Sequence, residues 1–200
     1  MHVCLKHLFG GKNYFAPLST VNPPRRILDI ATGTGTWAIE MSDEFPNAEI
    51  IGTDLSPIQP NYVPENVHFY IEDALEDWFY SNPLDYIFVR LATGVWSNFE
   101  RDCARKAFDN LEPGGWFEAQ EILPGMLCDD GTMPEDWPLK RLMEDLHDCA
   151  EQIDRSLRCA ETYKQALVNV GFVDIQQITY KIPINNWPRE RKWKELGSSA

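Results

Sequence analysis

The chain has 200 residues, 44% of them hydrophobic and 24% charged, and a formal net charge of −13 at pH 7. This length and composition predict one globular domain with a sizeable core and exclude a disordered chain. The acidic balance would repel the phosphates of a nucleic acid, so we expect small molecules or basic protein segments as partners instead.

The apolar runs and the cysteines indicate in which cellular compartment the chain would be found. No apolar run reaches the length of a membrane span, and the N-terminal stretch MHVCLKHLFGGKNYF lacks the pattern of a signal peptide. The five cysteines are widely spaced, with no C-x-x-C pair. This usage predicts reduced thiols, no metal site, and a cytoplasmic or nuclear location.

Strands and helices are predicted to alternate from residue 26 onward. Arg26–Ile30 is a short apolar run after two prolines and predicts a buried strand. Thr36–Phe45 has the apolar spacing of a helix, and Glu49–Asp54 predicts the next strand. The resulting β-α-β unit favours parallel, right-handed pairing.

The alternation continues toward the C-terminal end. Further strands are predicted at Val67–Ile71, Leu84–Val89 and Trp116–Ile122, with a helix over Phe99–Leu111. A loop at 123–137 and helical segments near 138–153 and 158–170 follow. Period-two alternation predicts a sixth strand at Val173–Ile182.

This order predicts a single α/β domain with a Rossmann-like fold, in which helices cover both faces of a mostly parallel, twisted sheet. We divide it into an N-terminal lead-in at 1–24, a cofactor-binding core at 25–122, a substrate-side insertion at 123–157, and a C-terminal helix and strand at 158–200.

The stretch ILDIATGTGTWAIE at 27–40 joins the first predicted strand to the first helix, and its glycines allow two interpretations. Gly33-Thr34-Gly35-Thr36-Trp37-Ala38 satisfies the dinucleotide pattern G-x-G-x-x-G/A, and Asp54 follows at about the expected 20 residues. Alternatively, Asp29 places a carboxylate four residues before Gly33, as S-adenosylmethionine sites often do.

Carboxylates at three successive strand ends favour the second interpretation. Asp29 would compete with a pyrophosphate for the positive end of the helix, whereas it suits the amino group of a methionine moiety. Asp54 suits ribose hydroxyls with either cofactor, and Asp73 suits the exocyclic amine of adenine. Together they suit a sulfonium cation better than an anionic dinucleotide.

These residues also carry a family likeness. The chain resembles class I S-adenosylmethionine-dependent methyltransferases, and specifically the fungal LaeA-type (UMTA-like) group. The likeness rests on LDIATGTGTWAIE, EIIGTDLSPIQPNYVPENVHFYIEDALEDW, LEPGGWFEAQE, DDGTMPED and GFVDIQQITYKIPINNWP. GTDLSPIQP followed by VPENV is specific to that group. The resemblance implies a fungal origin and a link to secondary metabolism or nuclear regulation.

The resemblance also implies a cofactor role for the matching residues, grouped by the part of S-adenosylmethionine that they would contact. These are Asp29, Gly33 and Gly35 at the methionine end, Asp54 at the ribose, Leu55, Asp73 and Ala74 at the adenine, and Ala31 and Arg90 at neighbouring positions of the same site.

The chain departs from the group's pattern in two ways. Ala31 stands where the first glycine of the loop is usual; a negative φ there would cost little, and a positive φ about 1 kcal/mol or more. Relatives also have a longer N-terminal lead-in and a final antiparallel strand, so the resemblance implies a domain shortened at both ends, without that strand.

Methyl transfer needs aligned reactants more than acid–base groups. The polar residues near the ends of the fourth and fifth strands are Arg90, Gln120 and Glu121. Glu121 is the single candidate for a catalytic or substrate contact, and a structural hydrogen-bonding role is the alternative.

Three functions stay open at this point. The first is methyl transfer from S-adenosylmethionine to a small metabolite or a basic protein side chain. The second is a non-catalytic regulator that acts through protein partners. The third is an NAD-dependent oxidoreductase, against which stand Asp29 and the lack of a Tyr-x-x-x-Lys pair.

Overall fold

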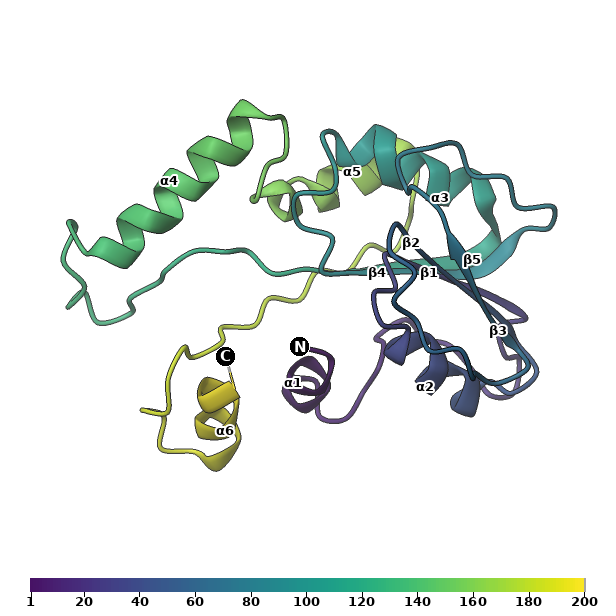
Figure 1. Ribbon diagram of the computed structural model, residues 1–200, viewed down its shortest axis with the longest axis horizontal. Helices are drawn as coiled ribbons and strands as arrows, with labels where there is room; N and C mark the ends of the chain where they lie inside the picture. Colours follow the sequence, from purple (N-terminus) through teal and green to yellow (C-terminus); the bar gives the residue numbers. More distant parts are fainter. Residues whose placement is uncertain (200) are drawn as a thin grey trace.

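A sheet of five parallel strands forms the centre of the computed structural model, which describes residues 1–199. The strands are β1 (Arg26–Ile30), β2 (Glu49–Asp54), β3 (Val67–Ile71), β4 (Leu84–Arg90) and β5 (Leu111–Gln120). They lie in the order β3-β2-β1-β4-β5 (Figure 1). The order reverses at β1, and doubly wound sheets bind ligands at the carboxyl ends of the strands beside such a reversal.

Helices cover both faces of the sheet, as predicted. One face carries α2 (Thr36–Glu44), and the other carries the π-helical turn η1 (Glu100–Ala104), α3 (Arg105–Asn110) and α5 (Tyr163–Val170), with the short 3₁₀ turn η2 (Cys159–Glu161) before α5 (Figure 1). β1 and β4 are therefore buried on both sides, which accounts for their continuous apolar runs.

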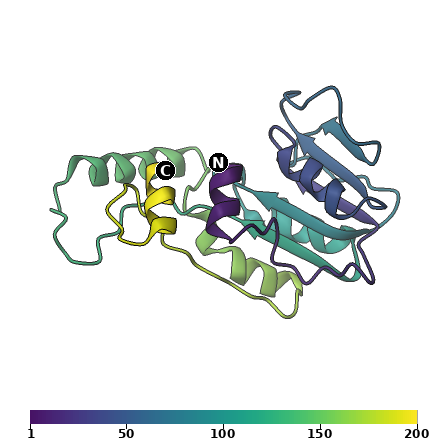
Figure 2. The same ribbon diagram turned by 90° about the horizontal axis from the view of Figure 1, so that it is seen from below.

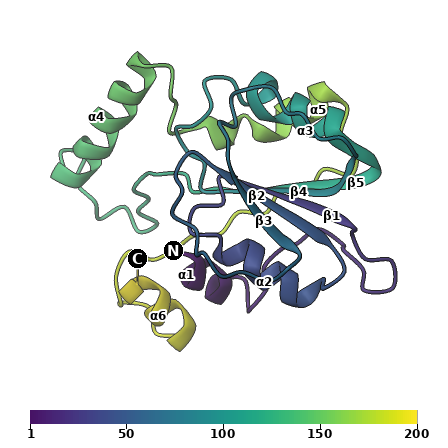
Figure 3. The same cartoon turned by 45° about the vertical axis from the view of Figure 1, so that its right-hand side comes forward.

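Three further helices lie toward the carboxyl side of the sheet. The helix α1 (His2–Leu8) packs through Leu5 and Leu8 on Leu196 of α6 (Arg191–Ser199), and the two are neighbours in Figures 2 and 3. By contrast, α4 (Pro138–Gln152) projects away from the sheet (Figure 1). No helix in the described chain is long and apolar enough to cross a membrane.

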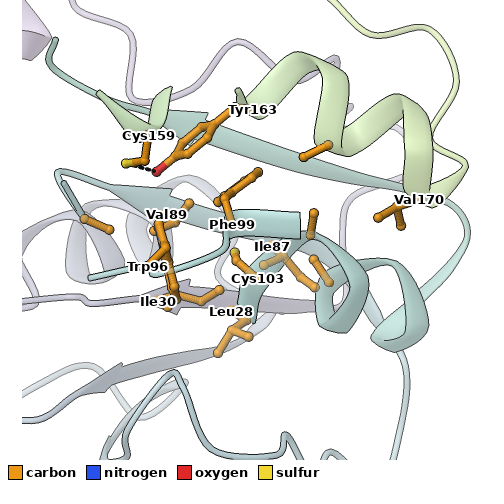
Figure 4. Close-up of a cluster of buried hydrophobic side chains, with 14 of the residues drawn as sticks. Leu28, Ile30, Ile87, Val89, Trp96, Phe99, Cys103, Cys159, Tyr163 and Val170 are labelled. Carbon is orange, nitrogen blue, oxygen red and sulfur yellow. Dashed lines mark hydrogen bonds between the residues drawn. The ribbon is translucent and has the colours of Figure 1, made fainter. Parts of the chain in front are cut away.

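Each face of the sheet has its own aromatic core. On the α2 side, the rings of Trp37 and Phe88 are stacked with centroids 3.9 Å apart. On the α5 side, Phe99 stacks on Tyr163 at 3.6 Å, and the tyrosine hydroxyl reaches the thiol of Cys159 (Figure 4). The strands β1 and β4 are packed between these two layers, which position the loops at their carboxyl ends.

The prediction of a sixth strand at Val173–Ile182 is wrong. That stretch contains no strand, and Val173 is 80% exposed. An alternating sequence becomes a strand only when a neighbour completes its hydrogen bonds, and in the described residues β5 pairs with β4 alone. Every strand pairing there is parallel.

The other predicted elements differ mainly at their ends. The strands β1, β2 and β3 have the predicted bounds, and β4 is longer by Arg90. The fifth strand, predicted at Trp116–Ile122, runs over Leu111–Gln120. A bulge opposite Leu84–Tyr86 carries its Pro-Gly-Gly segment along the edge of β4. The helix predicted from Phe99 begins as a π-helical turn.

Candidate functional site

The loop between β1 and α2 has an unusual backbone. Ala31, Gly33 and Gly35 all have positive φ, at 55°, 58° and 73°. The positive value at Ala31 is the costly case considered above, about 1 kcal/mol for a residue with a Cβ. The backbone N–H of Thr32 donates to the carbonyl oxygen of Thr53 at 2.9 Å, which ties the loop to β2.

Asp54, at the end of β2, holds the loop from the other side. Its Oδ2 atom accepts a hydrogen bond of 2.8 Å from the backbone N–H of Gly33, and its Oδ1 atom accepts one of 2.9 Å from Ser56. An ionised carboxylate has about four acceptor positions, so Asp54 keeps capacity for two hydroxyl donors. Gln59 adds a bond of 2.6 Å to the carbonyl oxygen of Gly33.

Asp29, near the end of β1, is buried under α2. It is 3% exposed and accepts a hydrogen bond from the hydroxyl of Thr32. Burial raises the pKa of this carboxyl to about 7, and the positive charge of Arg90 opposes that rise. A cation bound next to Asp29 would therefore be favoured, because it would replace the water that burial removes.

Arg90, at the end of β4, connects the sheet to the N-terminal helix. Its Nη2 atom donates to Nδ1 of His2 at 2.6 Å, because arginine has no acceptor. Nε2 of His2 lies 3.1 Å from Oε1 of Glu40 on α2, and the same glutamate pairs with Lys6. The helix α1 is thereby fixed over the carboxyl ends of β1 and β4.

The three residues predicted at the adenine lie on the far side of the glycine loop. Leu55 follows β2 and is 66% exposed. Oδ1 of Asp73 accepts a hydrogen bond of 2.9 Å from the N–H of Leu75. The carbonyl oxygen of Ala74 accepts from Lys106 at 3.1 Å. They follow β2 and β3, so the predicted set extends along the carboxyl ends of neighbouring strands.

Glu121, the candidate for catalysis, lies apart from these residues. Its Oε2 atom accepts hydrogen bonds from the N–H of Ala92 at 3.0 Å and from the hydroxyl of Tyr163 at 3.4 Å, and its Oε1 atom accepts from Ile122. These partners are on the α5 side of the sheet, whereas Asp29 and Arg90 face α1 and α2. The contacts favour the structural alternative.

A shallow hollow of about 400 Å³ lies beside α1. It is lined by His2, Val3, Lys6, His7, Gly10, Gly11, Glu40 and Lys192. It meets the polar residues at the strand ends only through His2 and Glu40, so we do not assign the cofactor to it. Residues 1–199 hold no cluster of three or more His, Cys, Asp or Glu side chains that could bind a metal ion.

Comparison with known proteins agrees with this geometry. Residues 8–177 match the profile of the methyltransferase domain family. The chain belongs to this family. Among curated relatives, methyltransferase pytC of Aspergillus terreus is 37% identical over 99% of the chain and 60% of its own length. Secondary metabolism regulator LAE1 of Cochliobolus heterostrophus is 36% identical over 86% of the chain and 57% of its own length. The chain thus spans about half to 60% of the length of the curated relatives it matches.

Solved structures show the same methyltransferase fold. The phosphoethanolamine N-methyltransferase 2 of Haemonchus contortus, solved with phosphomonomethylethanolamine and S-adenosylhomocysteine, has a TM-score of 0.59 at 23% identity, over 87% of this chain and 37% of its own. The plantazolicin methyltransferase BpumL has a TM-score of 0.55 at 16% identity, over 84% and 63%. The Rossmann-like, class I methyltransferase fold predicted from the sequence is confirmed.

Three residues of this site were not predicted from the sequence. His2 and Asn13 come from the lead-in, and Gln59 comes from the SPIQP segment. Nothing in the local pattern around His2 or Asn13 indicates that a fold would bring them to the ends of β4 and β5. Gln59 had a signal, because it lies within the motif that follows Asp54.

Proposed function

We propose that this domain binds S-adenosylmethionine and transfers its methyl group to a small metabolite or a basic protein side chain. The observation that carries the proposal is the hydrogen bond from the N–H of Gly33 to Asp54. This bond holds the Asp54 carboxylate against the glycine loop, with acceptor positions still unoccupied. Ribose hydroxyls fit the remaining acceptor positions of Asp54. The buried carboxyl of Asp29 fits a cationic methionine end.

The residues of this chain would bind and orient the donor. Gly33 and Gly35 would let the ligand approach the loop backbone, with Ala31 as part of the same turn. Leu55, Asp73 and Ala74 would bracket the adenine. When bound, S-adenosylmethionine supplies a methyl group whose bond to sulfur breaks as the acceptor's electron pair forms the new bond, leaving S-adenosylhomocysteine. Orientation then supplies most of the acceleration.

The relatives support both of the leading interpretations. The name of pytC supports methyl transfer as the activity. The names of the secondary metabolism regulators support a regulatory role. The alternative function is therefore a regulatory domain, which would act through protein partners in the nucleus or cytoplasm. The acidic surface suits a basic segment in either case. An acceptor screen separates the two, because only the enzyme converts S-adenosylmethionine in the presence of some acceptor.

Calorimetric titration of the purified chain with S-adenosylhomocysteine, and separately with NAD, tests the proposal. We expect micromolar binding of S-adenosylhomocysteine and none of NAD. Asp54→Ala removes the acceptors for the ribose and should abolish binding, whereas Asp129→Ala, an exposed carboxylate after β5, should leave it unchanged. Binding of NAD alone, or of neither ligand by the folded chain, would reject the proposal.

A further inference from the structure

Two acceptor oxygens near the carboxyl end of β5 have no hydrogen-bond donor among residues 1–199. They are Oε1 of Gln120 and Oδ1 of Asn13, and both atoms are buried. Gln120 itself is 8% exposed. Amides in protein interiors normally satisfy their oxygen atoms, because a buried acceptor without a donor destabilises the fold. Such atoms call for a donor from outside the chain, either a water molecule or a ligand.

The orientation of the Gln120 amide is fixed by its neighbours. Its Nε2 atom donates to Oε1 of Glu118 at 2.8 Å and lies 3.4 Å from the carbonyl oxygen of Asn13. Both neighbours are acceptors, so exchanging the nitrogen and oxygen of the amide would place three oxygens against one another. Oε1 is therefore the buried atom of this amide that lacks a hydrogen-bond donor.

Gln120 stands next to the one arginine of the predicted cofactor set. Arg90 and Gln120 are register partners on adjacent strands. Alternate residues of a strand share a face, which places Arg90 with Phe88 and Gln120 with Glu118 on the α2 side. The guanidinium carbon of Arg90 lies 5.6 Å from the ring centroid of Phe88, in agreement with this placement.

Asn13 forms the cover over the same corner. Its carbonyl oxygen accepts a hydrogen bond of 2.9 Å from the indole N–H of Trp37 and approaches Gln120 from above the sheet. Glu118 fixes the lead-in just beyond it, with Oε2 accepting the N–H groups of Phe15 and Ala16 at 2.8 Å. The lead-in is thus held in place by hydrogen bonds at Asn13 and just after it.

We propose that Gln120 and Asn13 add two acceptors to the subsite that Asp29 provides for the ammonium of an α-amino acid group, and that this group is the methionine end of S-adenosylmethionine. An α-amino acid group carries a carboxylate and an ammonium on one carbon atom, so its recognition requires a cation and acceptors side by side. Arg90 supplies the cation, and the two unpaired oxygens supply the acceptors. His2 engages one of five guanidinium N–H donors, which leaves others for a carboxylate.

This inference rests on the proposed function. Titration with two ligands distinguishes failure of the inference from failure of the proposed function. The ligands are S-adenosylhomocysteine and its analogue that lacks the α-amino group. Gln120→Met keeps the size and removes the acceptor, and Asn13→Ala removes the second acceptor. Gln165→Met makes the same chemical change at an exposed position of α5, on the other face, and serves as the matched control.

We expect Gln120→Met and Asn13→Ala each to lower the affinity for S-adenosylhomocysteine about tenfold, which is the effect of losing one hydrogen bond to a charged group. Affinity for the deaminated analogue should not change, because that ligand has no donor for these oxygens. The Gln165→Met control should bind both ligands as the original chain does.

Three results would overturn the inference. Unchanged affinity for S-adenosylhomocysteine in both variants would mean that water satisfies these oxygens. An equal loss of affinity for both ligands would mean that Gln120 and Asn13 only shape the site. If the original chain binds no S-adenosylhomocysteine, the proposed function itself fails. Should Gln120→Met not fold, Asn13→Ala answers the same question on its own.

Discussion

The ring of Phe69 in β3 lies directly against Gly35, so that a Cβ atom at residue 35 would be 2.3 Å from Cζ of the ring. The same ring fills the space beside Gly52 of β2, where a Cβ would be 2.6 Å from Cδ1. Phe69 therefore supports the glycine loop from below and requires a glycine at both positions. An aromatic side chain two strands away thus occupies the space under the loop.

Replacing Gly35 by alanine should destabilise the chain more than replacing Gly33. Both residues have positive φ, so alanine costs about 1–2 kcal/mol of backbone strain at either one. Only residue 35 adds a collision with Phe69, for a total loss of about 3 kcal/mol or more in the free energy of unfolding.

Urea unfolding measures the difference. Gly125→Ala is the control, because a Cβ at Gly125 would meet nothing within 4 Å and its φ is not positive. Equal losses at residues 33 and 35 would show that Phe69 moves aside without cost and does not support the loop.

The sequence predicted the part of the fold that depends on local pattern. β1, β2 and β3 are short apolar runs between turn residues, and the buried sheet turns such runs into strands with little ambiguity. The residues Asp29, Gly33 and Asp54 were identified by spacing, and the structure brings them together at two adjacent strand ends. Spacing alone was sufficient because parallel neighbours end at the same edge.

The remaining features depend on contacts that no local pattern encodes. Period-two alternation at 173–182 is the same whether or not a neighbouring strand exists, so the predicted strand could not be distinguished from an unpaired segment. The positions of His2 and Asn13 depend on how the lead-in crosses the sheet. Phe69 could be assigned to a strand, but its contact with Gly35 depends on the twist between β3 and the loop.

Asp29 should make the stability of the chain fall as the pH rises. Burial, partly offset by the Thr32 hydroxyl and Arg90, raises the pKa of this carboxyl from 3.8 to about 7 in the folded chain. Between these two values the folded state binds more protons than the unfolded state, so the free energy of unfolding decreases with increasing pH. Above the folded pKa, the full destabilisation from burying ionised Asp29 is present.

Asp29→Asn removes this titration. The stability of the variant relative to the original chain should rise across the window by up to about 4 kcal/mol. Urea unfolding of both chains at several pH values between about 4 and 8 gives the comparison, and the difference between them cancels the other titrating groups. A constant difference would show that Asp29 is already ionised in the folded chain at the lower pH.

Glu121 should behave as a structural residue. Replacing it by alanine leaves the N–H of Ala92 and the hydroxyl of Tyr163 without their acceptor, at a cost of about 2 kcal/mol or more in stability. Affinity for S-adenosylhomocysteine should not change, since these partners lie on the α5 side of the sheet. Calorimetry and thermal unfolding of Glu121→Ala check both expectations, and a loss of affinity without loss of stability would return Glu121 to the binding site.

Protonation of His2 in acid should loosen the N-terminal helix α1. Burial and the neighbouring Arg90, in that order, lower the pKa of His2 below its ordinary 6.5 in the folded chain, although Glu40 opposes them. The folded chain therefore favours neutral His2, whose Nδ1 atom can accept the bond from Arg90. The stability that this contact contributes is present at neutral pH and is lost as the pH falls below the unfolded pKa and through the folded one.

Hydrogen exchange of the amides in α1 reports this loosening. At about pH 5, after correction for intrinsic rates, protection relative to neutral pH should fall in the original chain by more than in His2→Gln, whose side chain does not titrate. His7→Gln changes a histidine on the same helix that faces Glu195 and not Arg90, so it should keep the acid sensitivity of the original chain. Equal protection in the original chain and His2→Gln at both pH values would show that the Arg90 contact does not hold the helix over the site.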